Sequence, residues 1–165
     1  MLKESALKGK RAKMGQADGT KMMIRLMEIG DIPGAAELEK ELFSQPWSEK
    51  SLKEALERDD SVYAVCIAGG EVAGYCGVYL TGNEGYINNV AVCTKRQGTG
   101  IGRQLLSFML QKAGERGMKA CTLEVRPSNE RALRLYHSLG FEDAGIRPRF
   151  YDKPTEDALI MWLYL

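Results

Sequence analysis

Residues 90–106 read VAVCTKRQGTGIGRQLL, and in this stretch a β-branched run passes through a glycine-rich turn into an amphipathic helix. Gly98, Gly100 and Gly102 remove every second side chain at the junction. Backbone N–H groups can therefore point outward together, beside the positive end of the helix dipole. The stretch predicts a seat for a phosphate or pyrophosphate group, although a glycine turn without a ligand has the same composition.

Two better-known phosphate loops do not match these residues. A Walker loop requires a lysine after its last glycine, where this chain has Arg103. The dinucleotide pattern G-x-G-x-x-G fails because Gly102 comes one residue too early. What remains is Gln97-x-x-Gly100-x-Gly102, flanked by Arg96 and Arg103. This pattern resembles the Q/R-x-x-G-x-G/A pyrophosphate loop of the GNAT superfamily of N-acetyltransferases, which bind acetyl-coenzyme A.

Composition limits the classes of protein to be considered. The chain has 165 residues, 44% of them hydrophobic, which is enough for one well-packed domain but not for two. Its net charge of +1 gives no overall electrostatic attraction to nucleic acid, so direct nucleic-acid binding is not expected. No apolar run has the length of a membrane span, and we expect a cytoplasmic protein.

The first 22 residues differ from the rest in charge. Their basic residues outnumber two acidic ones, and they lack the apolar centre of a secretion signal. The basic residues are Lys3, Lys8, Lys10, Arg11, Lys13 and Lys21. We expect a flexible basic arm over residues 1–22, either solvated or in contact with ribosomal RNA, and a single domain over residues 23–165.

The cysteines argue against a metal site. Cys66, Cys76, Cys93 and Cys121 are widely spaced in apolar runs, no C-x-x-C pair occurs, and His137 is the only histidine. A zinc site is therefore not expected. Without a secretion signal, four buried free thiols in a reducing compartment are favoured over two disulfides.

Periodicity predicts an α/β fold with a mixed sheet and helices on both faces. Helices are expected after Asp31, after Ser48, from Ile101 to about Gly117, and from Pro127–Ser128 to Gly140. Strands are expected over residues 24–27, 62–68, 72–80, 84–92, 120–125, 141–150 and 157–164, with a hairpin at Gly69–Gly70. The same order of elements occurs in the acetyltransferase fold.

Two residues after the glycine loop are candidates for proton transfer. Glu124 lies between apolar neighbours in a strand that should be central, where a carboxylate is costly unless it is paired or has a task. Acetylation of an amine needs a base, because an ammonium group cannot attack a thioester, and the leaving thiolate then needs a proton, which Tyr136 can supply. Structural alternatives remain: Glu124 can pair with a basic neighbour, and Tyr136 can pack on Phe141 at a helix end closed by Gly140.

Several motifs in the same order strengthen the resemblance. They are LEVRPSNERALRLYHSLGF at 123–141, Pro46-Trp47-Ser48, and the terminal Arg147, Phe150-Tyr151 and Glu156-Asp157-Ala158. Together with the glycine loop they resemble the RimI family, which acetylates the amino-terminal alanine of a small-subunit ribosomal protein. The resemblance covers about residues 23–165 and leaves only the basic arm outside it.

The resemblance assigns roles to individual residues. It implies that Glu124 is the general base and Tyr136 the general acid, and that Trp47 and Tyr151 contact the acceptor peptide. It implies that acetyl-CoA binds at Val90, Ala91, Val92, Gln97, Gly98, Thr99, Gly100, Ile101, Gly102, Arg103 and Asn129. Trp47 can equally be a core residue.

Two departures from the family bear on the acceptor. Phe150 stands where the family usually has a tyrosine, and Tyr86 occupies a strand position where relatives often carry an acid. Both leave the peptide preference open. Acetylation of protein lysines or of a small amine stays an alternative, and so does an acetyl-CoA-binding module without catalysis, although such a module has no need for Glu124 and Tyr136 together.

We expect direct transfer from acetyl-CoA, which binds first, to a peptide amine that enters from the opposite side. The rival mechanism passes the acetyl group through Cys93 or Cys121. Direct attack is favoured because the sequence offers a base for the amine and no dedicated activator for a thiol.

Overall fold

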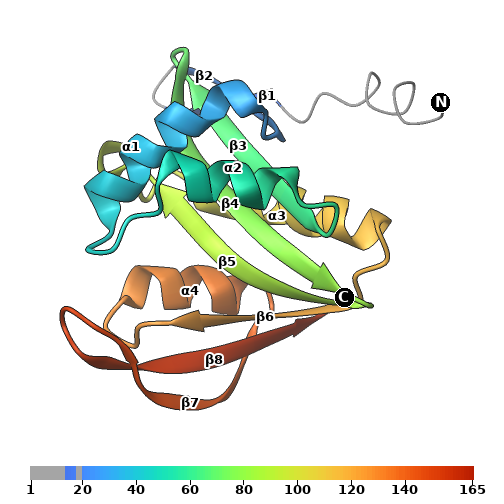
Figure 1. Ribbon diagram of the computed structural model, residues 1–165, viewed down its shortest axis with the longest axis vertical. Coiled ribbons are helices and arrows are strands. Elements are labelled where there is room, and N and C mark those ends of the chain that lie inside the picture. Colours follow the sequence, from blue (N-terminus) through green and yellow to red (C-terminus); the bar gives the residue numbers. More distant parts are fainter. Residues whose placement is uncertain (1–13, 18–19) are drawn as a thin grey trace.

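The computed structural model describes residues 14–17 and 20–165 (Figure 1). Within them, eight strands form one sheet in the order β1-β2-β3-β4-β5-β6-β8-β7. The strands are β1 (Met14–Ala17), β2 (Thr20–Leu26), β3 (Ser61–Ala68), β4 (Glu71–Thr81), β5 (Glu84–Val92), β6 (Ala120–Val125), β7 (Glu142–Tyr151) and β8 (Glu156–Tyr164). The helices are α1 (Ile32–Leu42), α2 (Glu49–Glu57), α3 (Ile101–Glu115) and α4 (Glu130–Ser138), with short 3-10 turns η1 (Ile29–Asp31) and η2 (Thr94–Arg96).

Helices cover both faces of the sheet, as the sequence predicts. Helices α1 and α2 lie in front of the sheet in Figure 1 and α3 lies behind it. The apolar residues of α3 that recur at helical spacing, Leu105, Leu106 and Met109, are fully buried. This burial gives the sheet a core on the face that α3 covers.

The helix starts show which sequence signals are used. The Ser48 hydroxyl oxygen accepts a hydrogen bond from the Ser51 N–H and caps α2, as predicted. Asp31 occupies the cap position of α1 but makes no capping bond to that helix. Its carboxylate instead accepts hydrogen bonds from the Arg25 guanidinium at 2.7 and 2.9 Å and from the Glu28 N–H. These bonds form because strand β2 brings Arg25 within reach of Asp31.

The central strands β5 and β6 part from each other after a short pairing. They are parallel and pair at only three positions, Glu84–Tyr86 with Ala120–Thr122, whereas all the other strand pairs of the described sheet are antiparallel. Asn88 is passed over in the register between β4 and β5, which marks a bulge on β5. Beyond Tyr86 the two strands diverge (Figure 1) and leave a gap in the middle of the sheet.

The predicted boundary between arm and domain is wrong in its position. Strand β2 begins at Thr20 and crosses residue 22, and Met14–Ala17 pair with it as β1. The pairing of such a strand depends on its partner, and a segment of only four residues, MGQA, shows too little alternation to predict it. The rest of the predicted basic arm, residues 1–13 and 18–19, lies outside the described residues.

Gly77 is expected to tolerate no side chain. A Cβ at this position would lie 2.1 Å from the ring of Tyr63, which is buried beside Tyr75. We expect Gly77→Ala to lower the free energy of unfolding by about 1–3 kcal/mol, measured by urea denaturation. Gly30→Ala is the matched control, because a Cβ there meets nothing within 4 Å. Equal midpoints for the two variants would contradict the expectation.

Candidate active site

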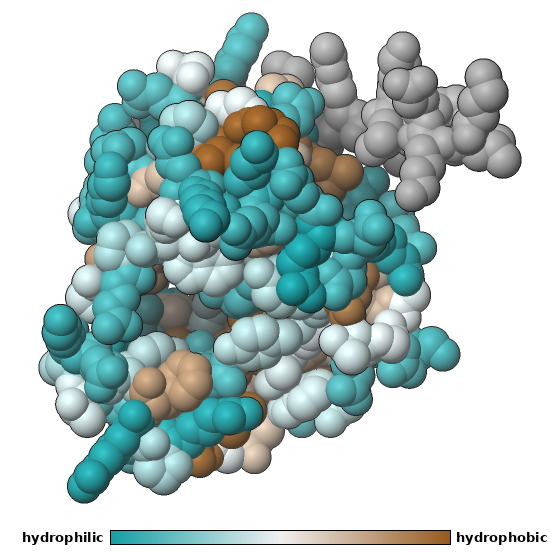
Figure 2. Space-filling view, in the orientation of Figure 1, coloured by the Kyte–Doolittle hydropathy of each residue, from teal (hydrophilic) through white to brown (hydrophobic). Residues whose placement is uncertain are grey.

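The gap between β5 and β6 forms a cavity of about 730 Å³. Residues 87–90 of β5 line one side, and residues 123–125 of β6 with Arg126 directly after it line the other. The end of α1 with the segment after it (Leu42, Phe43, Ser44, Gln45 and Trp47) and the end of β7 with the turn after it (Phe150 to Pro154) close it on the outside. Figure 2 shows the surface hollowed at this place, between the part with α1 and α2 and the part with α4.

Glu124 lies in the wall of this cavity with both carboxylate oxygens engaged. Its neighbours Leu123 and Val125 point into the core, so alternation along β6 turns Glu124 toward the other face. The side chain is 8% exposed. The Tyr86 hydroxyl donates a hydrogen bond to Oε2 at 2.5 Å, and Arg147 Nε lies 3.3 Å from Oε1. Both predicted alternatives for Glu124 are thus compatible with its place: it is paired, and it lines the cavity.

One partner of Glu124 precedes it in the sequence and the other follows it. Tyr86 ends the paired part of β5, and Arg147 belongs to the edge strand β7. The Arg147 side chain is 59% exposed, so its ion pair with Glu124 is screened by water and contributes little stability. The contact can therefore open when another group approaches the carboxylate.

Tyr136 also lines the cavity, from α4. The residue is 7% exposed, and its ring packs on Phe141 with the centroids 5.7 Å apart, as predicted for a closed helix end. Burial raises the pKa of the Tyr136 hydroxyl well above its usual range, so the group is a proton donor rather than a phenolate at neutral pH. Tyr136 thus fits both predicted alternatives, because its ring packs on Phe141 and the residue also lines the cavity.

The glycine loop has the backbone that the sequence predicts. Gly98 and Gly100 have φ angles of 79° and 90°, in the left-handed region that favours glycine. Gly100 is the N-cap of α3, and among the described residues no side chain caps that helix. The first N–H groups of α3 are therefore available to an anion at the positive end of the helix dipole.

Side-chain contacts hold this loop against α4. Gln97 Nε2 donates a hydrogen bond to the Val92 carbonyl, and its Oε1 accepts one from Arg131. The Thr99 hydroxyl donates to the Arg96 carbonyl, and Arg103 donates to the Ser138 hydroxyl at 2.6 Å. A Cβ at Gly102 would lie 3.1 Å from Leu135 of α4, which explains the third glycine as a close approach of two helices.

The structure brings only some of the predicted residues to the cavity. Val90, Asn129 and the two candidate acceptor contacts, Trp47 and Tyr151, line it together with Glu124 and Tyr136. Ala91 and Ile101 are buried in the core, and neither they nor Val92 and the loop 97–103 belong to its lining. Asn129 also caps α4, because its Oδ1 accepts a hydrogen bond from the Ala132 N–H. The predicted start of this helix at Pro127–Ser128 is therefore two residues early.

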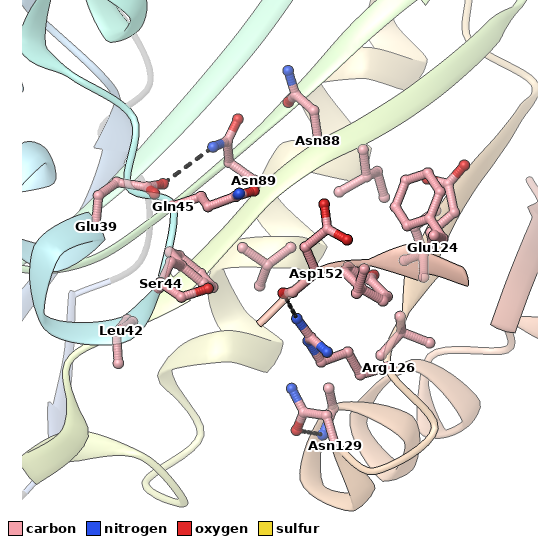
Figure 3. Close-up of a pocket in the computed structure, with 18 of the residues that line it drawn as sticks. Glu39, Leu42, Ser44, Gln45, Asn88, Asn89, Glu124, Arg126, Asn129 and Asp152 are labelled. Atoms are coloured by element: carbon pink, nitrogen blue, oxygen red, sulfur yellow. Dashed lines mark hydrogen bonds between the residues drawn. The ribbon is translucent and has the colours of Figure 1, made fainter. Parts of the chain in front are cut away.

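The outer wall of the cavity is fastened by a carboxylate that the sequence marks only as part of a motif. Glu156 accepts hydrogen bonds from the N–H and the hydroxyl of Ser128, and these bonds lower its pKa. Arg126 donates to the carbonyls of Pro154 and Asp152 and lies 4.3 Å from the centre of the Tyr151 ring. Figure 3 shows the bond between Arg126 and Asp152 at the edge of the cavity. These contacts place Tyr151 in the wall.

Sequence reasoning missed two polar residues of the cavity, Glu39 and Asn89. Both are buried, and Asn89 Nδ2 donates a hydrogen bond to Glu39 Oε1 at 3.2 Å (Figure 3). The available signal was an acid within the apolar stripe of α1, four residues after Ala35 and next to Leu38.

The cysteines are free and buried, as predicted. Burial raises the pKa of Cys121 to about 12, and neither Cys93 nor Cys121 lines the cavity. Both observations disfavour transfer through a thiol. Within residues 14–17 and 20–165 there is no cluster of three or more His, Cys, Asp or Glu side chains arranged to hold a metal ion.

No helix in the described part of the chain is long and apolar enough to cross a membrane.

Comparison with known proteins identifies similar chains. Residues 32–141 match the model of the acetyltransferase (GNAT) family. A ribosomal protein bS18-alanine N-acetyltransferase of Escherichia coli K12 is 35% identical over 144 residues, covering 85% of this chain and 95% of that protein. The N-alpha-acetyltransferase RimI of Mycobacterium tuberculosis is 35% identical over 151 residues, covering 88% and 94%. The crystal structure of the Escherichia coli ribosomal-protein-S18-alanine N-acetyltransferase superposes with a TM-score of 0.80 at 33% identity, covering 87% and 93%.

Proposed function

This chain belongs to the GNAT family of acetyl-CoA-dependent N-acetyltransferases, and we propose that it acetylates the amino-terminal amine of a protein, most specifically the terminal alanine of a small-subunit ribosomal protein. The observation that carries the proposal is a cavity that holds a carboxylate and a protonated phenol in one gap of the sheet. The names of relatives that match nearly the whole chain support the acceptor. The buried free cysteines support a reducing, cytoplasmic compartment.

The proposed donor site uses the glycine loop and the adjoining strand. The N–H groups at the start of α3 bind the pyrophosphate of acetyl-CoA, and Arg96 and Arg103 lie on either side of the loop. The end of β5, residues 90–92, and Asn129 hold the part that carries the thioester. Acetyl-CoA supplies the activated acetyl group. A single domain that includes residues 23–165 performs the transfer.

The proposed transfer is direct. The acceptor amine enters between Trp47 and Tyr151, and Glu124 removes its proton as the nitrogen attacks the thioester carbonyl. The C–S bond then breaks, and Tyr136 gives its proton to the departing thiolate. Tyr86 and Arg147 hold the carboxylate in place before the acceptor arrives.

The chemistry favours an α-amine over a lysine. An α-amino group has a pKa of about 7.8 and a lysine of about 10.4, so deprotonation near pH 7.4 costs roughly 0.5 kcal/mol for the first and roughly 4 kcal/mol for the second. A single carboxylate base removes the first proton far more easily.

Removal of the base is expected to slow the transfer without abolishing donor binding. We expect Glu124→Gln to lower kcat by about 10²–10⁴-fold, with the affinity for acetyl-CoA nearly unchanged. Glu84→Gln is the matched control, since Glu84 is exposed on β5 and does not line the cavity. The measurement is steady-state thiol release together with calorimetric titration of CoA. Turnover of Glu124→Gln equal to that of the control would remove Glu124 from this role.

The pH dependence follows from the raised pKa of Tyr136. An acid whose pKa lies above its usual value of about 10 stays protonated as the pH rises, so kcat is expected not to fall between about pH 7 and 10. Tyr136→Phe should lower kcat by about 10²-fold or more at every pH in this range. Tyr164→Phe, at an exposed tyrosine near the chain end, should behave as the wild type. An alkaline decline of kcat near pH 9 that disappears in Tyr136→Phe would contradict the assignment.

A panel of three acceptors tests the proposed function. It contains an Ala-Arg peptide with a free amino terminus, the same peptide with a blocked terminus and an internal lysine, and a polyamine. Thiol release and mass spectrometry report the rate and the position of the acetyl group, with Glu124→Gln as the blank. We expect acetylation of the free terminus. Activity on only the blocked peptide or only the polyamine would contradict the proposed acceptor and indicate a lysine or small-amine acetyltransferase instead. Binding of CoA without acetylation of any of the three acceptors would indicate a binding module without catalysis.

A further inference from the structure

A buried carboxylate connects the segment that contains Trp47 with strand β5. Glu39 of α1 is 2% exposed, and it accepts hydrogen bonds on both oxygens. Oε2 accepts from the Trp47 N–H at 3.2 Å. Oε1 accepts from the Tyr75 hydroxyl and, at 3.2 Å, from Asn89 Nδ2 (Figure 3). One side chain of α1 therefore contacts the segment before α2 and the strands β4 and β5.

This arrangement is costly for a purely structural position. Among the described residues Glu39 has no ion-pair partner, and a carboxylate taken out of water without a cation depends entirely on its hydrogen bonds. The neighbouring positions of α1 that face the same core, Ala35 and Leu38, are apolar. An apolar residue at position 39 would avoid the burial of a charge, but it would leave the Trp47 N–H and the Tyr75 hydroxyl without this acceptor.

The Trp47 end of the network belongs to the acceptor side. The Trp47 N–H lies in the segment between α1 and α2, of which Phe43, Ser44, Gln45 and Trp47 line the cavity. The hydrogen bond to Glu39 fixes the backbone of this segment at the residue proposed to contact the peptide. Loss of the bond would leave the N–H without that partner and the segment free to shift.

The Asn89 end belongs to the donor side. Asn89 follows the bulge residue Asn88 and directly precedes residues 90–92, the proposed seat of the thioester. Tyr63 Oη lies 3.2 Å from Asn89 Oδ1 and 3.3 Å from Asn88 Oδ1, so its single proton can be donated to either amide oxygen. Asn88 Nδ2 is buried, and within the described residues it has no hydrogen-bond partner, although Asn88 lines the cavity. A donor bound along residues 90–92 would contact the backbone that directly follows Asn89, and this continuity of β5 links the donor to the network.

We propose that Glu39 is a positioning residue that couples the two substrate sites, so that a donor bound along β5 orders the Trp47 segment for the acceptor. The proposal rests on the function proposed above for the two sides of the cavity. Donor binding fixes the bulge and Asn89, Asn89 fixes the Glu39 carboxylate, and the carboxylate fixes the Trp47 N–H. Because coupling between two binding sites is reciprocal, the acceptor must strengthen donor binding by the same factor.

A substitution at Glu39 separates this coupling from simple folding. A carboxylate accepts on two oxygens and an amide on one, so Glu39→Gln loses the contact to one of the two sides. Glu37→Gln is the matched control, because Glu37 lies on the same helix, is exposed, and pairs only with Lys40. Thermal melting of each variant reports whether it is folded.

The experiment measures acceptor affinity by calorimetry with and without saturating CoA, which cannot be turned over. The acceptor is whichever member of the panel is acetylated, so a wrong acceptor assignment does not affect the result. We expect CoA to tighten acceptor binding by about 5-fold or more in the wild type and in Glu37→Gln, and by less than about 2-fold in Glu39→Gln. No tightening in the wild type, or full tightening in Glu39→Gln, would overturn the proposal.

If Glu39→Gln does not fold, amide hydrogen exchange of the wild type tests whether CoA binding orders the Trp47 segment. We expect the segment that contains the Trp47 N–H to exchange more slowly when CoA is bound, because the bond to Glu39 is then held more firmly. Exchange at the same rate with and without CoA would overturn the proposal.

Discussion

The site depends on a parting of two parallel strands. Strands β5 and β6 share three residue pairs and then diverge, and the bulge at Asn88 accompanies the divergence. Two inner strand edges are thereby opened within a sheet that is otherwise continuous. Backbone N–H and C=O groups at such edges require partners, and in the middle of a domain a substrate can provide them. The cavity is thus a consequence of strand pairing that stops early.

Side chains then give this gap its chemistry and its shape. Glu124 comes from β6 and Tyr136 from the helix that follows it, so one β–α unit carries both proposed proton-transfer groups. Glu156 and Arg126 fasten the outer wall, and Glu39 fastens the inner one. In each wall a charged side chain accepts or donates hydrogen bonds that involve backbone groups outside its own helix or strand. These bonds help to position the walls.

Much of this arrangement could be predicted from the sequence, because it follows from local patterns. Helical periodicity predicted α1 to α4, and the glycines predicted the loop before α3. The partners of Glu124 could not be predicted, since Tyr86 and Arg147 reach it only through the register of neighbouring strands. Strand β1 was missed because its pairing with β2 is not encoded by alternation in its own residues. The role of Glu39 was missed because an acid in a helix is ordinarily a surface residue.

Strand β7 lies at the edge of the sheet, and nearly all of its residues are exposed. It contributes Arg147 and Phe150 to the region around the site and almost nothing to the core. Replacements along this strand are therefore nearly neutral for folding, while they alter what the site admits. Evolution can therefore diversify the polypeptides that such an enzyme accepts by changing this one strand at positions other than Arg147, whose contact with Glu124 belongs to the reaction centre.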